Sequence, residues 1–366
     1  MAAWLVLEVF CVSAHAQSGP TTFDDVVLRA AAAREQNDVP HAIELYGQAV
    51  KLRPEWPDGW WFLGLMRYSA DDYTSAADAL THFIQLTPDA GPAIALRGLC
   101  EFETSDYAQS LKDIQRGIAL GAANQPRNGK ILRYHEALLL THSGNFEGAL
   151  QKYGLLARGK VPNPELLVGI GLAGLRTALM PKDLKADKQD LFMAAGNAAF
   201  IFMSGDQKGA QQAFQDLFQR YPNIPNEHYF YGYLLFATDP DQAILEFRRE
   251  LEISPTNAAA QLMVGWDSLM RNNFSEALAY GKKAVAEEPN LPIAQLVLGR
   301  ALVETGDVKG GIEHLEKELQ FDPDNLETHL ALAKAYSKSG RKEDARRERL
   351  QCLALSKNEA TPGARP

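Results

Sequence analysis

The residues best suited to hold a metal ion are eight histidines and three cysteines. His135 and His142 would share one face of a helix, but no carboxylate at metal-ligand spacing completes a set. His314 is flanked by Glu313 and Glu316, which is not the HExxH arrangement of a zinc-binding helix. The sequence therefore predicts no metal site.

The three cysteines, Cys11, Cys100 and Cys352, are far apart, and no CxxC pair occurs. A zinc site or a redox-active pair needs closely spaced thiols. We therefore expect neither a zinc site nor an intrachain disulfide, and we interpret Cys100 and Cys352 as buried thiols.

Motifs for phosphate binding or nucleophilic catalysis give no support for an enzyme. The sequence has no GxxxxGK[ST] and no GxSxG pattern. Residues 169–174 read GIGLAG, but a dinucleotide cradle needs a strand-to-loop-to-helix setting and no strand is evident. We interpret these glycines as close helix packing, and we predict no catalytic residue and no cofactor.

The net charge of the chain argues against a nucleic-acid-binding protein. The chain has 366 residues and a formal net charge of -9, whereas phosphate binding requires a basic surface. At 46% hydrophobic residues, the chain can bury a core.

The first residues resemble a signal peptide. An apolar run from Trp4 to Val12 precedes Ala14-His15-Ala16, which has the small-x-small form of a cleavage site. We expect residues 1–16 to be removed and the protein to be exported, either to the periplasm or outside the cell. Glu8 and the absence of an early basic residue leave an alternative, in which the leader packs on the first repeat of a cytoplasmic protein. No later stretch reaches the ~18 apolar residues of a membrane span.

Stepwise repeats organise the rest of the chain. Prolines recur 34 positions apart at Pro54 and Pro88, and again at Pro255, Pro289 and Pro323. Pro222 lies 33 positions before Pro255. Twelve positions before each of these six prolines is a small residue: Ala42, Ala76, Ala210, Ala243, Ala277 and Gly311. Eight positions before it is often a bulky one: Tyr46, Leu80, Phe214, Phe247 and Leu315. Residues typical of turns, such as Ser143-Gly-Asn and Thr305-Gly-Asp, lie between the two expected helices of a unit. The pattern predicts two antiparallel helices per unit, packed closely at the small residue and ended by the proline.

The 34-residue unit resembles the tetratricopeptide repeat. Segment 57–90 carries the family's positions with Trp60, Leu63, Gly64, Ala76, Leu80 and Pro88. The resemblance implies an all-α fold: a right-handed superhelical solenoid of about nine 34-residue helix-turn-helix repeats plus one truncated unit.

Two segments depart from the pattern. Unit 91–124 has Ser110, Gly117 and Ala122 where Ala, Ala and Pro are expected, and segment 164–190 is too short for a repeat. We predict an N-terminal array at 23–163, a truncated repeat at 164–190, a C-terminal array at 191–355 and a disordered tail at 356–366.

In this family, the second, fifth, ninth, twelfth and thirteenth positions of a unit face a concave groove. Those positions are mostly apolar here: Trp61, Leu65, Tyr68, Leu99, Phe102, Phe202, Met203, Leu262, Trp266, Leu269 and Met270. Such a groove suits an amphipathic helix or an extended apolar segment of a partner protein. The alternative is that neighbouring repeats cover these side chains.

The sequence therefore predicts a non-catalytic scaffold that binds a protein or peptide, and neither nucleic acid nor a membrane span. A homo-oligomer built by repeat stacking is the alternative, and an enzyme has no supporting motif. Residues 334–349 carry a net charge of +4, which suits either an acidic partner or a soluble outer face of the last repeat.

Overall fold

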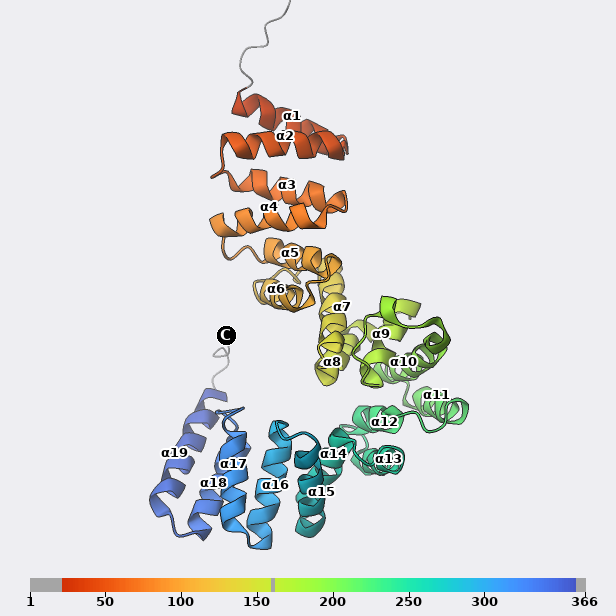
Figure 1. Cartoon of the computed structure of the whole chain (residues 1–366), viewed down its shortest axis with the longest axis vertical. Helices are drawn as coiled ribbons and strands as arrows, with labels where there is room; N and C mark the ends of the chain where they lie inside the picture. The colour runs from red at the N-terminus through yellow and green to blue at the C-terminus, as the bar shows by residue number, and fades with distance from the viewer. Residues whose placement is uncertain (1–21, 159–161, 360–366) are drawn as a thin grey trace, which may run out of the picture. The chain divides into compact units, whose positions relative to one another are not determined.

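The computed structural model describes residues 22–158 and 162–359, which form helices joined by turns, with no strand among them (Figure 1). The predicted leader, residues 1–16, and the end of the predicted tail, 360–366, lie outside the described residues. Helix α19 includes residues 356–359, which we had assigned to that tail.

The helices form two compact units, one ending at Leu139 and the other beginning at Leu140, within helix α7. The first unit contains α1 (Phe23–Glu35), α2 (Val39–Leu52), α3 (Pro57–Ser69), α4 (Tyr73–Leu86), α5 (Gly91–Glu103), α6 (Tyr107–Ala119) and most of α7 (Pro126–His142). The predicted array limits, 23–163 and 191–355, remain a prediction.

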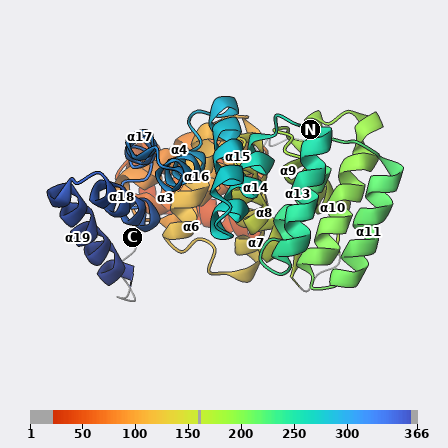
Figure 2. The same ribbon diagram turned by 90° about the horizontal axis from the view of Figure 1, so that it is seen from below.

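The second unit has the other helices. They are α8 (Phe146–Ala157), α9 (Pro164–Gly174), α10 (Gln189–Met203), α11 (Gln207–Arg220), α12 (Glu227–Leu235), α13 (Pro240–Ile253), α14 (Ala258–Met270), α15 (Phe274–Glu287), α16 (Pro292–Thr305), α17 (Val308–Glu318), α18 (Leu326–Lys338) and α19 (Lys342–Glu359). Two short 3-10 helices, η1 (Pro181–Asp183) and η2 (Ala186–Lys188), separate α9 from α10. Figure 2 shows α10, α11 and α13 of this unit from below.

The predicted helix-turn-helix pairs are confirmed, and their buried side chains form clusters that extend from one pair into the next. The small residues Ala42, Ala76, Ala210, Ala243 and Ala277 are all 0% exposed. Four positions after Ala42, Ala76, Ala210, Ala243 and Gly311, bulky residues fill the adjoining space and are at most 1% exposed: Tyr46, Leu80, Phe214, Phe247 and Leu315.

The turn inside most pairs combines a left-handed residue with a helix N-cap. The left-handed residues are Asn37, Asp71, Ser105, Gly144, Gly205, Asn272 and Gly306. The next residue in each case caps the second helix by accepting a backbone N–H three positions on: Asp38, Asp72, Asp106, Asn145, Asp206, Asn273 and Asp307. The left-handed residue ends the first helix and the cap satisfies a free N–H of the second, so the chain reverses within two residues.

Side chains at the fourth position of several units bind the proline carbonyl that precedes the unit. Trp60 Nε1 donates to Pro54 O at 2.7 Å, and Gln295 Nε2 donates to Pro289 O at 2.7 Å. Gln261 and His329 make the matching contacts with Pro255 and Pro323. Carbonyls at a helix end have no partner within the helix, so these donors join each repeat to the next.

The glycine-rich segment lies in α9, which packs against α10. A Cβ on Gly171 would lie 1.9 Å from Phe192 O, and one on Gly196 would lie 1.8 Å from Leu167 O. Only glycine permits this approach of two helix backbones, which confirms the interpretation of these glycines as packing residues.

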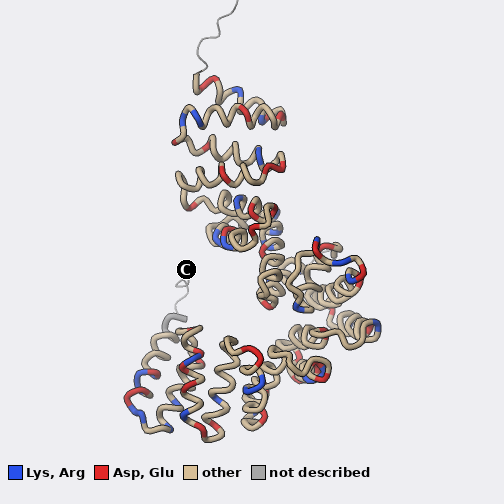
Figure 3. The backbone as a smooth tube through the Cα atoms, in the orientation of Figure 1, with Lys and Arg blue, Asp and Glu red and all other residues tan. Residues whose placement is uncertain are grey.

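Figure 3 shows acidic and basic residues interspersed along the helices of each unit. None of the helices in the described residues is both long and apolar enough to cross a bilayer.

Candidate partner-binding site

The first unit has an apolar groove lined by residues of α3, α5 and α7. Its volume is about 430 Å³. Twelve uncharged residues line it: Trp61, Leu65, Pro92, Ala95, Leu96, Leu99, Gly121, Ala122, Gln125, Asn128, Ile131 and Leu132. It is therefore a surface made by the first helices of successive units and by the loop that precedes α7.

The groove is hollow because small residues lie between large ones. Ala95 and Ala122 are almost fully buried, whereas Ile131 on α7 is 41% exposed. A Cβ on Gly117 would lie 2.7 Å from the Cβ of Ala95, so α6 approaches α5 closely behind this part of the groove. Gly117 and Ala122 are two of the residues by which unit 91–124 departs from the repeat pattern, so the irregular unit forms part of the groove.

Three of the predicted partner-binding residues meet in this groove. Trp61, Leu65 and Leu99 line it, and the Trp61 ring also packs on Phe83 at 5.6 Å between centroids. The packing behind Trp61 holds its ring in place, as an anchor for a partner requires.

The other two predicted residues of the first unit contact neighbouring aromatic side chains. The ring of Tyr68 lies 5.5 Å from that of Tyr73, and the ring of Phe102 lies 4.7 Å from that of His135. Both are half-buried and are absent from the groove lining.

The second unit places its predicted residues differently. Leu262 is 8% exposed and Leu269 is 2% exposed, so these two belong to the core and their assignment to a groove needs correction. Leu262 packs with Ala284 and Val297, because α15 and α16 close over this side of α14.

The remaining four predicted residues differ in their exposure. Trp266 is half-buried against the same core, and Met270 is 47% exposed at the end of α14. Phe202 and Met203 are half-buried at the end of α10.

Sequence reasoning missed nine of the twelve groove residues: Pro92, Ala95, Leu96, Gly121, Ala122, Gln125, Asn128, Ile131 and Leu132. The last four of them lie on α7 or just before it, where the loop after α6 breaks the repeat phase. The predicted groove positions were counted from the start of each 34-residue unit, and no unit start could be assigned in this segment. The signal that was available is the missing proline, replaced by Ala122.

Arg97 of α5 is hydrogen-bonded to the neighbouring helices. Arg97 Nε donates to Asp113 of α6 at 2.6 Å, and its Nη1 donates to Thr81 of α4 at 3.2 Å. Burial, together with the nearby Asp113 carboxylate, raises the pKa of Glu101 to about 7. These groups are on the far side of α5 from the groove residues, which keeps the groove lining uncharged.

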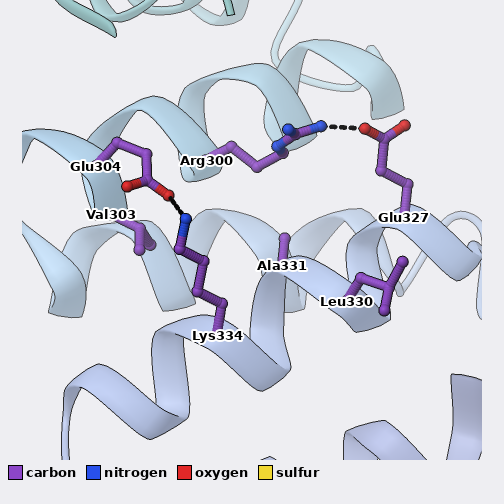
Figure 4. A pocket seen from close by; sticks show the side chains of 7 residues that line it. All are labelled: Arg300, Val303, Glu304, Glu327, Leu330, Ala331 and Lys334. Atoms are coloured by element: carbon purple, nitrogen blue, oxygen red, sulfur yellow. Dashed lines mark hydrogen bonds and ion pairs between the residues drawn. The ribbon is translucent and has the colours of Figure 1, made fainter. Parts of the chain in front are cut away.

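A smaller pocket of about 210 Å³ in the second unit has a different character (Figure 4). Arg300 of α16 pairs with Glu327 of α18, and Glu304 of α16 pairs with Lys334 and Lys338 of α18. Burial works against ionisation of Glu304, but the two lysines outweigh it and lower its pKa. Each of these charges already has a partner, so we interpret the pairs as links between successive repeats.

Comparison with known proteins identifies the repeat. A model described as tetratricopeptide repeat matches residues 27–91 and 262–326. The chain contains tetratricopeptide repeats in these two segments. The first match covers α1 to α4, and its positions include Trp61 and Leu65 of the groove.

Two curated relatives of this repeat protein are distant in sequence. The chain is 22% identical to the CTR9 homolog of Arabidopsis thaliana over 315 residues, which are 83% of this chain and 26% of that protein. It is 27% identical to cellulose synthase operon protein C of Xanthomonas axonopodis pv. citri (strain 306) over 248 residues, 60% of this chain and 16% of that protein. The chain thus spans about a quarter or less of the length of these relatives.

Among solved structures, MamA from Desulfovibrio magneticus RS-1 is 20% identical to this chain. The alignment covers 47% of this chain and 97% of MamA, with a TM-score of 0.41.

Proposed function

We propose that the protein is a non-catalytic scaffold that binds a segment of a partner protein in the groove between α3, α5 and α7. The observation that carries the proposal is the uncharged, apolar lining of that groove. Covering half-buried Trp, Leu and Ile side chains releases ~25 cal/mol for each Å² of apolar area removed from water. The tetratricopeptide repeats of the chain support a role in binding proteins or peptides.

Capture of partners from native extract by matched variants tests this function. Trp61→Ala removes a groove wall, and we expect it to lower the retained partner at least about tenfold, as loss of an aromatic anchor does. Trp266→Ala is the matched control, because it removes a half-buried tryptophan from the second unit. A partner retained equally by Trp61→Ala and the unaltered chain would refute the assignment of the groove. Circular dichroism of each variant checks that the helices are intact.

An exposed apolar face on α19 favours a second candidate function, the structural homo-oligomer. Leu350 is 58% exposed and Leu353 is 57% exposed on this last helix. If two copies meet through α19, replacing both leucines by serine will reduce a concentration-dependent mass measured by light scattering to that of a monomer. A mass of one chain at all concentrations would exclude this function.

We also propose that the protein is exported, on the strength of the small-x-small site at Ala14-His15-Ala16. Mass spectrometry of the protein from its native source tests this directly. Cleavage predicts a mature chain that begins at Gln17, and a retained Met1 would contradict it.

A further inference from the structure

We propose that the groove takes an extended partner segment that presents two bulky, uncharged side chains on the same side of its chain. This inference rests on the proposed function and adds the chemistry and conformation of the segment. Three features of the groove support it: its charge, its size and the amides at one end.

The groove lining carries no charge, so it favours uncharged side chains of the partner. All twelve lining residues are uncharged, and the nearby Arg97 of α5 is already paired with Asp113. A Lys or Glu of the partner placed here would lose water without gaining an opposite charge, which is strongly unfavourable.

The size of the groove suits two side chains. An apolar cavity of about 150 Å³ holds a benzene molecule in another protein. The groove measures about 430 Å³, so a single leucine- or phenylalanine-sized group would leave much of its wall uncovered. Two such groups would contact both the α3 wall, at Trp61 and Leu65, and the α7 wall, at Ile131.

The amides at the α7 end favour an extended segment. Gln125 and Asn128 line the groove there, and each amide offers both a donor and an acceptor. A helix satisfies its own backbone groups, whereas an extended chain leaves N–H and C=O groups that need partners. In an extended chain, side chains two positions apart point to the same side, and adjacent ones point to opposite sides.

Two pentapeptides of identical composition test the inference with the full chain. Both are acetylated and amidated; one has leucine at positions two and four with serine elsewhere, and the other has leucine at positions two and three. Methyl NMR follows the side chains of Leu65, Leu96, Leu99 and Ile131 during titration. We expect the first peptide to shift these methyl signals and to bind at least about tenfold more tightly than the second, because only it places both leucines in the groove. Equal affinities would overturn the proposal, as would tighter binding of a helical peptide with leucines four positions apart.

Variants link the preference to the groove. Leu99→Phe narrows the groove and is expected to weaken the first peptide about tenfold, whereas Leu28→Phe, at an exposed site on α1, leaves its affinity unchanged. Gln125→Ala combined with Asn128→Ala is expected to weaken it as well, and an unchanged affinity in this double variant would refute the extended conformation.

The two proposals fail in different ways. Partner capture that depends on Trp61, with no preference between the pentapeptides, would overturn this inference and leave the proposed function standing. Discrimination between the peptides without Trp61-dependent capture would support the groove chemistry and overturn the scaffold function.

Discussion

Glu227, at the start of α12, has a carboxyl that is only 1% exposed. Burial raises the pKa of this group to about 7; the nearby His228 opposes this rise, and the Glu250 carboxylate adds a smaller contribution to it. Because the folded pKa exceeds the ordinary value of 4.5, the stability associated with the neutral form is complete below about pH 4.5 and is lost as pH rises through 7.

The substitution Glu227→Gln removes this titration. We expect the unaltered protein to lose on the order of 2–3 kcal/mol of unfolding free energy between pH 5 and pH 8 relative to the variant. Urea unfolding at several pH values measures the difference, with the exposed Glu252→Gln on α13 as the control. Parallel pH profiles for Glu227→Gln and the unaltered chain would show that Glu227 ionises normally.

Gln295 shows how a single polar side chain joins repeats. It is 0% exposed, donates to Pro289 O at 2.7 Å, and its Oε1 lies 2.7 Å from Nδ1 of His314. Gln295→Leu leaves the Pro289 carbonyl and the His314 nitrogen without this partner, so we expect a loss of about 1–3 kcal/mol in unfolding free energy. Gln211→Leu, at an exposed site on α11, is the control for adding an apolar side chain and should cost less than about 0.5 kcal/mol.

At the scale of helices, the pairing of helices was predictable because residues close together in each repeat determine it. Ala76 and Leu80 of α4 occupy a close helix contact, and Asp72 caps the start of the same helix, all within nine residues. The burial of Leu262 and Leu269 was not predictable from position alone, because it depends on how tightly α15 and α16 cover α14. The groove was predicted only in part, since Ile131 and Asn128 follow a loop that breaks the repeat period.

The N-caps between paired helices predict a measurable contribution to stability. Asp307 accepts the backbone N–H of Gly310 at 2.9 Å at the start of α17. Asp307→Ala removes that acceptor, and we expect it to lower the unfolding free energy by about 1 kcal/mol. Asp307→Asn should restore most of the loss, since an amide oxygen caps equally well. If Asp307→Asn does not recover the unfolding free energy, the stabilisation comes from the charge of Asp307 and not from the capping hydrogen bond.

At the scale of the whole molecule, the division into two compact units predicts two unfolding steps. Leu63 lies in the core of the first unit and Leu315 in that of the second, at 2% and 0% exposure. Each Leu→Ala change costs about 2–5 kcal/mol at its own site. Scanning calorimetry should show that Leu63→Ala lowers one transition and Leu315→Ala the other. A single transition that both variants lower equally would mean that the units unfold as one.

The central claim, that partners bind in the groove of the first unit, is tested most directly by photo-crosslinking in the native extract. A photoreactive amino acid replaces Leu96 in the groove in one version of the chain and the exposed Lys112 on α6 in another. The account predicts a crosslinked partner from position 96 that is absent from position 112 and that disappears when Trp61→Ala is added. A partner crosslinked from position 112 alone, or from position 96 regardless of Trp61, would contradict the account.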